Sequence, residues 1–243
     1  MTGTSFGSMR FHTVFSTAMP FLKQLFMHKT TFTVPLIATL FFSASLFAQK
    51  KSDGWAFKNE KDGVKVYYKK TSDVHEIKLV TSLKTSLSGV IQLFSEVENY
   101  TKWGYKISET KMLKKVNDQD FYYYSKIDFP WPLSDRDLIV QTKLEQDSVT
   151  RRVTSTSWSK YDYLPENKDV VRMKTTTTKW TLVPGAGGWL YVEYYIYADP
   201  GGSIPDWLVN MAIDVGPRET IKSMRTILQQ PKYQTAKLAY IKE

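Results

Sequence analysis

Very few side chains of this 243-residue chain belong to the types that carry acid–base, nucleophilic or metal chemistry. Cysteine is absent, so a thiolate nucleophile, a disulfide and a cysteine-ligated zinc site are excluded. Of the three histidines, only His75 lies outside the first fifty residues. A general base would therefore come from His75, Asp128, Glu193 or a tyrosine. We expect no metal and no cofactor, and enzymatic chemistry is the alternative hypothesis rather than the leading one.

Glu193 is the carboxylate with the most suggestive neighbours, because it alternates with tyrosines from Tyr191 to Tyr197. Alternate residues of a strand share one face of a sheet. If that face lines a pocket, Glu193 is the residue to test as a base. If it faces solvent, Glu193 is an ordinary cross-strand partner for a lysine. The sequence leaves both interpretations open.

Two stretches with strand periodicity mix tyrosine and serine with aliphatic residues on one face. A structural sheet face would carry more Val, Ile and Leu, whereas a pocket lining is mostly apolar with a few hydroxyls that orient a ligand. The alternative is that these tyrosines cover the outer face of the sheet. We predict that the following residues line a binding pocket: Tyr123, Ser125, Ile127, Tyr195 and Tyr197.

The segment from Asp199 to Gln230 predicts one long helix with a wide apolar face. A Pro-Gly-Gly turn precedes it, Ser203 is a candidate N-cap, and Gly216-Pro217 predicts a kink or short break. Because most of the preceding chain has strand periodicity, we expect this helix to lie on a sheet and to close a cavity. The helix residues predicted to contact a ligand are Trp207, Leu208, Met211 and Val215.

The elements that must position these residues are mainly β-strands. We predict a short helical lead-in at residues 53–58 and a helix that is capped by Ser86 or Ser88 and includes Val97. Strands joined by tight turns predict an antiparallel meander that curls into a deep, twisted sheet, in an α+β fold. The expected strands are 64–68, 77–85, 107–116, 119–129, 136–146, 149–158, 170–183 and 188–199.

The first part of the chain predicts an export signal. Residues 32–48 form an uncharged apolar stretch that follows Lys29 and ends in small residues. That layout is typical of a secretory signal peptide, with cleavage expected after Ala48. We therefore assign residues 1–48 to an N-terminal extension and signal peptide, and residues 49–243 to one domain in the periplasm or the extracellular space. A retained membrane anchor is the alternative.

The formal net charge of +9 and the pI of about 9.4 suit an anionic membrane surface. Clusters of Lys and Arg are the usual signature of a nucleic-acid-binding protein, and this chain has no run of five or more of them. We therefore expect no nucleic-acid partner.

A proline-rich corner separates two of the expected strands. Pro130 and Pro132 flank Trp131 and hold the chain extended, and Asp135-Arg136-Asp137 then presents alternating charges. An arginine between two carboxylates is most simply a structural clamp that pairs with them or bonds loop carbonyls. We therefore expect Trp131, Asp135, Arg136 and Asp137 to be structural.

This corner and its surroundings resemble the START family of lipid-transfer domains. The resemblance extends from about Trp55 to Leu228. The stretches that carry it are Gly63–Tyr67, the helix ending near Trp103, Glu109–Lys111, Pro130–Asp137 and Asp199–Asn210. The resemblance implies a helix-grip fold, in which an incomplete antiparallel barrel holds a hydrophobic tunnel closed by the C-terminal helix. It also implies that one lipid, such as a sterol or phospholipid, is bound, usually without catalysis.

The sequence departs from some members of that family at one position. Certain sterol-binding members carry an additional arginine, next to an acid, in the strand that follows the corner. Here Thr142 lies near that position. We therefore expect Thr142 in the cavity wall, no buried arginine–acid pair that points into the cavity, and no specific preference for a sterol.

The leading hypothesis is non-catalytic binding or carriage of a lipid or other apolar molecule outside the cytoplasm by a monomer. The break at Gly216-Pro217 is a candidate gate. Trp207, Met211, Lys222 and Arg225 are candidates for transient contact with a membrane. The alternatives are a helix-grip enzyme, such as a cyclase or hydrolase, and a periplasmic sensing or scaffold module.

Overall fold

The computed structural model describes residues 54–71 and 74–243. The predicted signal peptide, with its apolar stretch at residues 32–48, lies outside the described residues. Within the described ranges, no helix combines the length and the apolar character needed to cross a membrane.

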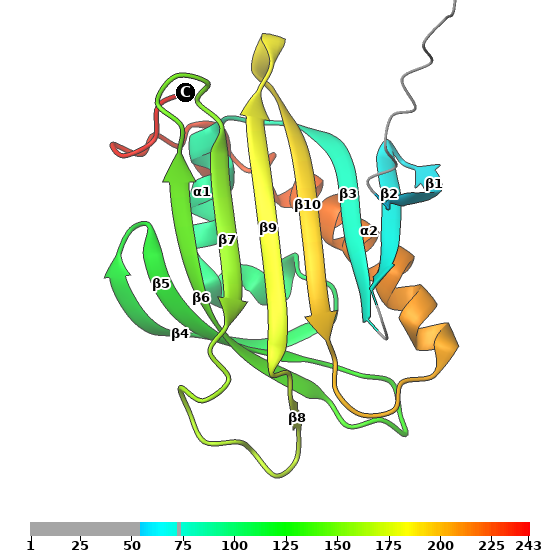
Figure 1. Cartoon of the computed structure of the whole chain (residues 1–243). Helices are drawn as coiled ribbons and strands as arrows, with labels where there is room; N and C mark the ends of the chain where they lie inside the picture. The colour runs from blue at the N-terminus through cyan, green and yellow to red at the C-terminus, as the bar shows by residue number, and fades with distance from the viewer. Residues whose placement is uncertain (1–53, 72–73) are drawn as a thin grey trace, which may run out of the picture. The chain divides into compact units, whose positions relative to one another are not determined.

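One curved sheet of ten strands forms the body of the molecule (Figure 1). Its order is β1-β2-β3-β10-β9-β7-β6-β5-β4, and neighbours along this path are antiparallel. The two-residue β8 pairs with β6 in parallel. The strands are β1 (Ala56–Lys61), β2 (Val64–Thr71), β3 (Val74–Lys84), β4 (Ile107–Asn117), β5 (Asp120–Ile127), β6 (Arg136–Gln146), β7 (Val153–Ser159), β8 (Val171–Arg172), β9 (Thr175–Pro184) and β10 (Trp189–Asp199).

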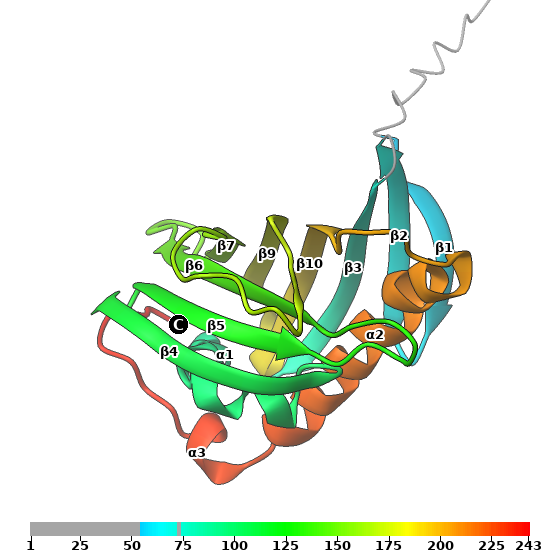
Figure 2. The ribbon, with the colours of Figure 1, turned by 90° about the horizontal axis from the view of Figure 1, so that it is seen from below.

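Helices occupy the concave side of this sheet. Figure 2 shows β1–β3 and β4–β5 turning to the same side, with α1 and α2 between them. The sheet is not closed, because β1 and β4 end the strand order. The predicted α+β helix-grip class is confirmed. The helical elements are α1 (Leu87–Ser95), the 3₁₀ helix η1 (Val97–Lys102), the 3₁₀ turn η2 (Ala186–Gly188), α2 (Asp206–Ile227) and α3 (Pro231–Gln234).

The pairing of β3 with β10 joins two parts of the chain that are about a hundred residues apart. Its register runs from Trp189 opposite Lys84 to Tyr197 opposite Glu76. From β4 to β10 the sheet is the predicted meander, apart from the short β8. The β1–β3 unit joins the sheet at β10, through the β3–β10 pairing. It forms the side of the curved sheet opposite β4 and β5. No local pattern predicts this pairing.

Two predicted elements are wrong. The lead-in at residues 53–58 was expected to be helical, but β1 begins at Ala56 and pairs with β2. The edge of β2 supplies hydrogen-bond partners, and the ring of Phe57 packs against Tyr67 with 5.5 Å between the ring centroids. The strand predicted at 170–183 is broken, because β8 leaves the main path to pair with β6. Tertiary contacts override the local pattern in both cases.

Helix α1 provides the core that the sheet wraps around. Ser86 is its N-cap, as predicted, and the Ser86 hydroxyl accepts a hydrogen bond from the Gly89 N–H at 3.0 Å. The apolar side chains of α1 are buried against the sheet and extend the core as far as η1. The buried residues of this helix are Leu87, Ser88, Gly89, Val90, Ile91, Leu93 and Phe94.

Helix α2 begins later than predicted and lacks the expected break. Its N-cap is Pro205 rather than Ser203, and the helix continues through Gly216 and Pro217. A proline inside a helix removes one hydrogen bond, so other contacts must stabilise this segment. Gly216 allows Tyr105 to approach, because a Cβ there would lie 3.2 Å from the Tyr105 ring. The predicted short break is therefore absent, and a kink or gate at this point stays a prediction.

Arg218 and Arg225 bind α2 to the β1–β3 unit. The Arg218 guanidinium donates to the carbonyls of Lys61 and Val64 at 2.7 and 3.0 Å and pairs with Asp214 at 2.6 Å. Arg225 donates to the Asp62 carbonyl and to the Thr81 hydroxyl. These charge-assisted bonds fix where α2 lies on the sheet.

A buried ion pair fixes the long loop that leads to β8. The Arg172 guanidinium binds both carboxylate oxygens of Asp137, at 2.7 and 3.0 Å. The same group donates to the carbonyls of Tyr161, Leu164 and Pro165. The side chains of Arg172 and Asp137 are 2% and 1% exposed. This is not the cavity-facing pair whose absence the sequence predicts, because Arg172 comes from β8 and neither Arg172 nor Asp137 lines the cavity between the sheet and α2.

The substitution Arg172→Met tests this pair. It leaves Asp137 buried without a partner, so we expect the free energy of unfolding to fall by about 3–5 kcal/mol. The matched control is Lys174→Met, which breaks an exposed ion pair with Glu166 whose side chains are 61% and 57% exposed. That variant should lose less than about 1 kcal/mol. Urea unfolding of the two variants measures both values, and equal losses would contradict the assignment.

Candidate functional site

A cavity of about 340 Å³ lies between the concave face of the sheet, η1 and α2. We call it the inner cavity. Strands β5, β6, β7, β9 and β10 supply most of its wall, and Ala212, Gly216 and Thr220 of α2 cover it. Its volume lies within the ~300–1,000 Å³ that is usual for small-molecule sites.

A row of hydroxyl groups crosses the floor of the inner cavity. The strand registers place Thr142 opposite Ser157, and Ser157 opposite Thr178. We call these three residues the hydroxyl row. The next strands continue it with Ile196 and Ile77, which are aliphatic. The Thr142 and Ser157 hydroxyls lie 2.7 Å apart and satisfy each other. The floor therefore has a polar centre with an apolar flank.

Three polar atoms in the wall have no hydrogen-bond partner. They are Ser125 Oγ on β5, Thr176 Oγ1 on β9 and Trp103 Nε1 just after η1. All three residues line the inner cavity and are buried. Among the described residues, one further buried side-chain atom, Thr85 Oγ1, lacks a partner. Folded proteins satisfy nearly all such groups, so this concentration makes the inner cavity the leading candidate for a binding site.

Aromatic side chains close one end of the inner cavity. Trp180 and Tyr194 stack with 3.7 Å between their centroids, and Tyr100 packs edge-on against Trp103 at 4.8 Å. Burial raises the pKa of Tyr123 to about 12, although a hydrogen bond with Ser157 opposes the shift. Burial also raises the pKa values of Tyr100 and Tyr194. These phenols stay protonated at neutral pH and cannot act there as bases.

The inner cavity continues into an outer pocket of about 620 Å³. The two share wall residues from β3, β5, β10 and α2, including Ala212 and Gly216. The charged residues that line the outer pocket are Lys70, Lys106, Asp128 and Asp199. None of the described residues that line the inner cavity is charged. Charge is thus confined to the outer part of this continuous space.

Six of the ten predicted ligand-binding residues lie along this space. Tyr123, Ser125, Ile127 and Thr142 line the inner cavity. Leu208 and Met211 line the outer pocket. Their contact with a ligand stays a prediction.

The other four predicted residues lie elsewhere. Tyr195 and Tyr197 face away from the cavity, because β10 presents Tyr194, Ile196 and Ala198 to it. The Tyr195 hydroxyl donates instead to Glu76 at 3.0 Å. Aromatic residues occupy both faces of β10, so alternation could not identify the inner face. On α2, two residues point outward, and 54% of Trp207 and 43% of Val215 are exposed.

Sequence reasoning missed most of the polar residues of the inner cavity. Thr176 and Thr178 belong to a run of four threonines, and β7 alternates serine with threonine or tryptophan. Neither stretch has an apolar face that would identify its buried side. Trp103 was recognised only as part of a family motif. The run of threonines was the available signal. Alternate residues of a strand face opposite sides of the sheet, so part of this run must point inward, where a hydroxyl needs a hydrogen-bond partner.

The proline-rich corner is a structural clamp. Arg136 donates to the carbonyls of Pro200 and Gly201 at 3.1 Å each, and to that of Ser134. Asp135 pairs with Lys126 at 2.9 Å and accepts a bond from the Phe129 N–H. Arg136 therefore binds loop carbonyls, while each flanking carboxylate has another partner.

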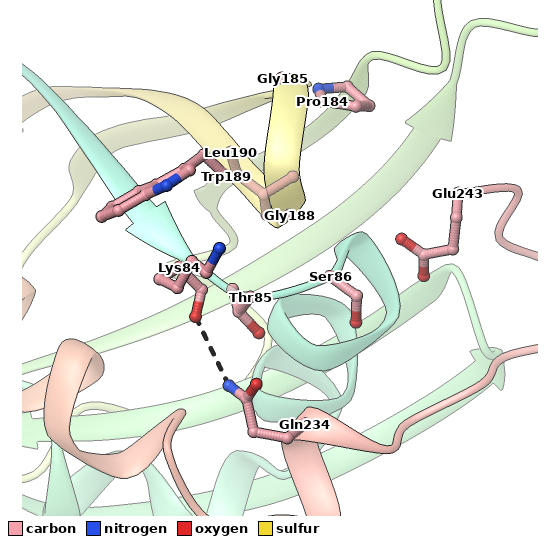
Figure 3. Close-up of a pocket in the computed structure, with 10 residues that line it drawn as sticks. All are labelled: Lys84, Thr85, Ser86, Pro184, Gly185, Gly188, Trp189, Leu190, Gln234 and Glu243. Atoms are coloured by element: carbon pink, nitrogen blue, oxygen red, sulfur yellow. Dashed lines mark hydrogen bonds between the residues drawn. The ribbon is translucent and has the colours of Figure 1, made fainter.

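A separate hollow of about 410 Å³ lies where β3 passes into α1 (Figure 3). The Glu243 carboxylate at its edge accepts bonds from the Leu87 and Ser88 N–H groups at 2.9 Å each. Lys84 donates to the Gly187 carbonyl. Both charged groups already bind the backbone, so this hollow is a weaker candidate than the inner cavity. Within residues 54–71 and 74–243, no group of three or more His, Asp or Glu is placed to hold a metal ion.

Comparison with known proteins gives one family. A START domain family model matches residues 44–234. An uncharacterised protein of Pseudomonas aeruginosa is 32% identical over 184 residues, which cover 74% of this chain and 89% of that protein. Mouse phosphatidylcholine transfer protein is 25% identical over 177 residues, which cover 70% of this chain and 81% of that protein.

Solved structures agree with this family. A STAR-related lipid transfer protein from Xanthomonas axonopodis has a TM-score of 0.67 and 31% identity, covering 73% of this chain and all of that fragment. Human STARD10 has a TM-score of 0.64 and 22% identity, covering 74% of this chain and 75% of that chain, and supports the fold alone.

The Lys126–Asp135 pair predicts an acid-sensitive corner. The hydrogen bond from Lys126, helped by the Phe129 N–H, lowers the pKa of Asp135 below its ordinary value. A carboxylate with a lowered pKa stabilises the fold above the ordinary value of about 3.9, and this stabilisation is lost as the pH falls through the folded-state value. We expect Asp135→Asn to be less stable at pH 7 and to lose less stability between pH 5 and pH 3.

Urea unfolding at each pH measures this effect. Lys126→Met is the companion variant, because it removes the same pair from the other side and should flatten the profile in the same sense. A profile of Asp135→Asn that runs parallel to that of the unaltered chain would refute the pairing.

Proposed function

The chain belongs to the START domain family, and from this we propose that it binds one lipid or other apolar small molecule, as a monomer and without catalysis. The ligand would lie between the concave face of the sheet and α2. The observation that carries the proposal is the inner cavity, whose described lining is apolar, aromatic or hydroxyl-bearing and lacks charge. Each buried CH₂ contributes about 0.8 kcal/mol, so a hydrocarbon chain can bind there without a strong polar contact.

Transfer between membranes is the second part of the proposal. Relatives at about 25% identity are named phosphatidylcholine transfer proteins, and a structure at 31% identity is named as a lipid transfer protein. The outer pocket supplies a route, since it continues from the inner cavity to the corner at Phe129 and Pro130 and to the start of α2. The apolar stretch at residues 32–48 supports a location in the periplasm or outside the cell.

The arrangement of titratable groups favours carriage over catalysis. Glu193 shares its strand face with Tyr195, away from the inner cavity. Asp128 is exposed and lines only the outer pocket. The phenol of Tyr123 stays protonated, because its pKa is about 12. The candidate bases whose side chains the structure describes therefore lack contact with the inner cavity, or are protonated at neutral pH and cannot accept a proton.

Two exposed tryptophans flank the outer pocket and supply a membrane-facing surface. Trp131 is 90% exposed beside Pro130, and Trp207 is 54% exposed beside Leu208. Tryptophan favours the boundary between water and lipid, because its ring is amphipathic. Arg225 is less suited to this role than its sequence position suggested, since it binds the Asp62 carbonyl and Thr81. Lys222 pairs with Glu219 at 3.5 Å.

Direct detection of a ligand tests the binding proposal. Native mass spectrometry of the full chain purified from its own host, followed by organic extraction, should show one lipid per chain. A chain that carries no lipid and also fails to bind the neutral dye Nile red would overturn the proposal.

Ala212→Phe should block the passage between the inner cavity and the outer pocket. Ala212 is exposed on α2 and lines both spaces, so the added ring fills their junction without crowding the core. We expect Nile red to bind at least about tenfold more weakly, while the melting temperature changes little. Ala186→Phe, in the exposed turn before β10, is the matched control and should bind normally. Equal binding by both variants would place the dye elsewhere.

Replacing Trp131 and Trp207 together by serine should slow transfer and spare binding. We expect a severalfold lower rate of movement of a fluorescent phospholipid between phosphatidylcholine vesicles, because both aromatic anchors at the mouth are lost. Trp189→Ser is the matched control, since Trp189 is 49% exposed but lines the separate hollow near α1. An equal slowing by the control would refute a localised membrane-facing surface.

A further inference from the structure

We propose that the part of the ligand that enters the inner cavity carries an uncharged oxygen acceptor, such as an ester, ketone or amide carbonyl. The donors available to it are Ser125, Thr176 and Trp103. Ionised groups of the ligand would stay in the outer pocket. This inference rests on the proposed function and deepens it by naming the chemical class of the bound group.

The three unpartnered polar atoms carry the inference. Ser125 is 2% exposed, Thr176 is 6% exposed and Trp103 is 7% exposed, and none of their side-chain polar atoms has a hydrogen-bond partner. Burying such a group without a partner is unfavourable, so a folded chain keeps it only where something else offsets the cost. A bound ligand can supply acceptors to these residues, since all three line the inner cavity.

The strand registers explain why these hydroxyls remain available. In the hydroxyl row, Thr142 and Ser157 face each other and bond at 2.7 Å. Thr176 lies one row further along and faces Ala198 on β10, which offers no side-chain partner. Ser125 faces Leu138 on β6, which is likewise apolar, and Thr110 on β4, whose hydroxyl donates to the Val97 carbonyl at 2.8 Å. The fold therefore satisfies one pair of hydroxyls internally and leaves these two unsatisfied.

The chemistry of the donors selects an acceptor. An indole N–H donates and cannot accept, and a serine or threonine hydroxyl can donate as well. A hydrocarbon would leave all three unsatisfied, whereas a carbonyl oxygen has two lone pairs to offer. The three groups come from β5, β9 and the residue after η1, so they line the cavity from different directions.

The absence of charge in the described lining argues against an ionised group at this depth. A carboxylate or phosphate would lose its hydration without meeting a cation, because the lysines of this space, Lys70 and Lys106, line only the outer pocket. An ammonium group would lack a counter-ion in the same way. The stacked faces of Trp180 and Tyr194 are 3.7 Å apart and cover each other, so neither inner face is open to a cation.

Four probes that share a ten-carbon chain and differ in one end group test the inference on the full chain. Decane, methyl decanoate, decanoate and decyltrimethylammonium are each used to displace Nile red. We expect methyl decanoate to displace the dye at about a fivefold lower concentration than decane, as one added neutral hydrogen bond allows. Decanoate and decyltrimethylammonium should both be weaker than methyl decanoate by about tenfold or more.

Single substitutions then locate the donors. Ser125→Ala, Thr176→Val and Trp103→Phe each remove one donor, so each should reduce the preference for methyl decanoate over decane while decane binds as before. The matched control is Thr177→Val on the other face of β9, which should leave the preference unchanged. The probe series on the unaltered chain stands as a test even if a variant fails to fold.

The outcomes separate this inference from the proposed function. If Nile red and decane bind but methyl decanoate shows no advantage, or decanoate binds equally well, the inference is overturned and the binding function is kept. The same holds if the donor variants behave like Thr177→Val. If neither Nile red nor any probe binds, the proposed function is overturned and the inference with it.

Discussion

The guanidinium of Arg136 is the contact on which the entrance to the cavity depends. It is 3% exposed and joins the corner after β5 to the turn before α2 through the carbonyls of Ser134, Pro200 and Gly201. Its Cζ atom also lies 4.2 Å from the ring centroid of Phe129. Burial lowers the pKa of this group, and Asp135 opposes the shift. One side chain thus joins two segments that line the outer pocket, because it contacts both Phe129 and Pro200.

The same use of arginine recurs at three other places. Arg172 fixes the loop before β8, and Arg218 and Arg225 fix α2 to β1–β3. In each case a planar donor binds several backbone carbonyls at once. None of these four arginines lines the inner cavity. In the described part of the chain, these arginines therefore hold loops and α2 in place. The lining of the inner cavity stays uncharged.

Buried hydroxyls in the middle of the sheet lower the apolar area that the fold can bury. The hydroxyl row occupies central strands, where Val or Ile would pack better. Compensation comes from the buried face of α1 and from the aromatic cluster in which Phe94 packs against Trp180 with 5.3 Å between ring centroids. A core that is apolar around α1 and polar at the cavity floor is consistent with a site that keeps some binding groups unsatisfied for a ligand.

Sequence alone determined the elements whose signals are local. Period-two alternation predicted most strands, Ser86 predicted the start of α1, and the corner around Arg136 predicted a clamp and, with the segment after Asp199, a family. Which face of β10 looks inward was decided only in the folded structure, because Tyr194 and Tyr195 are equally plausible until β10 pairs with β3. The Asp137–Arg172 pair and the continuity of α2 through Pro217 likewise depend on contacts between distant segments. The unpartnered donors at Ser125 and Thr176 emerge last, since a missing partner is visible only after every neighbour has been placed.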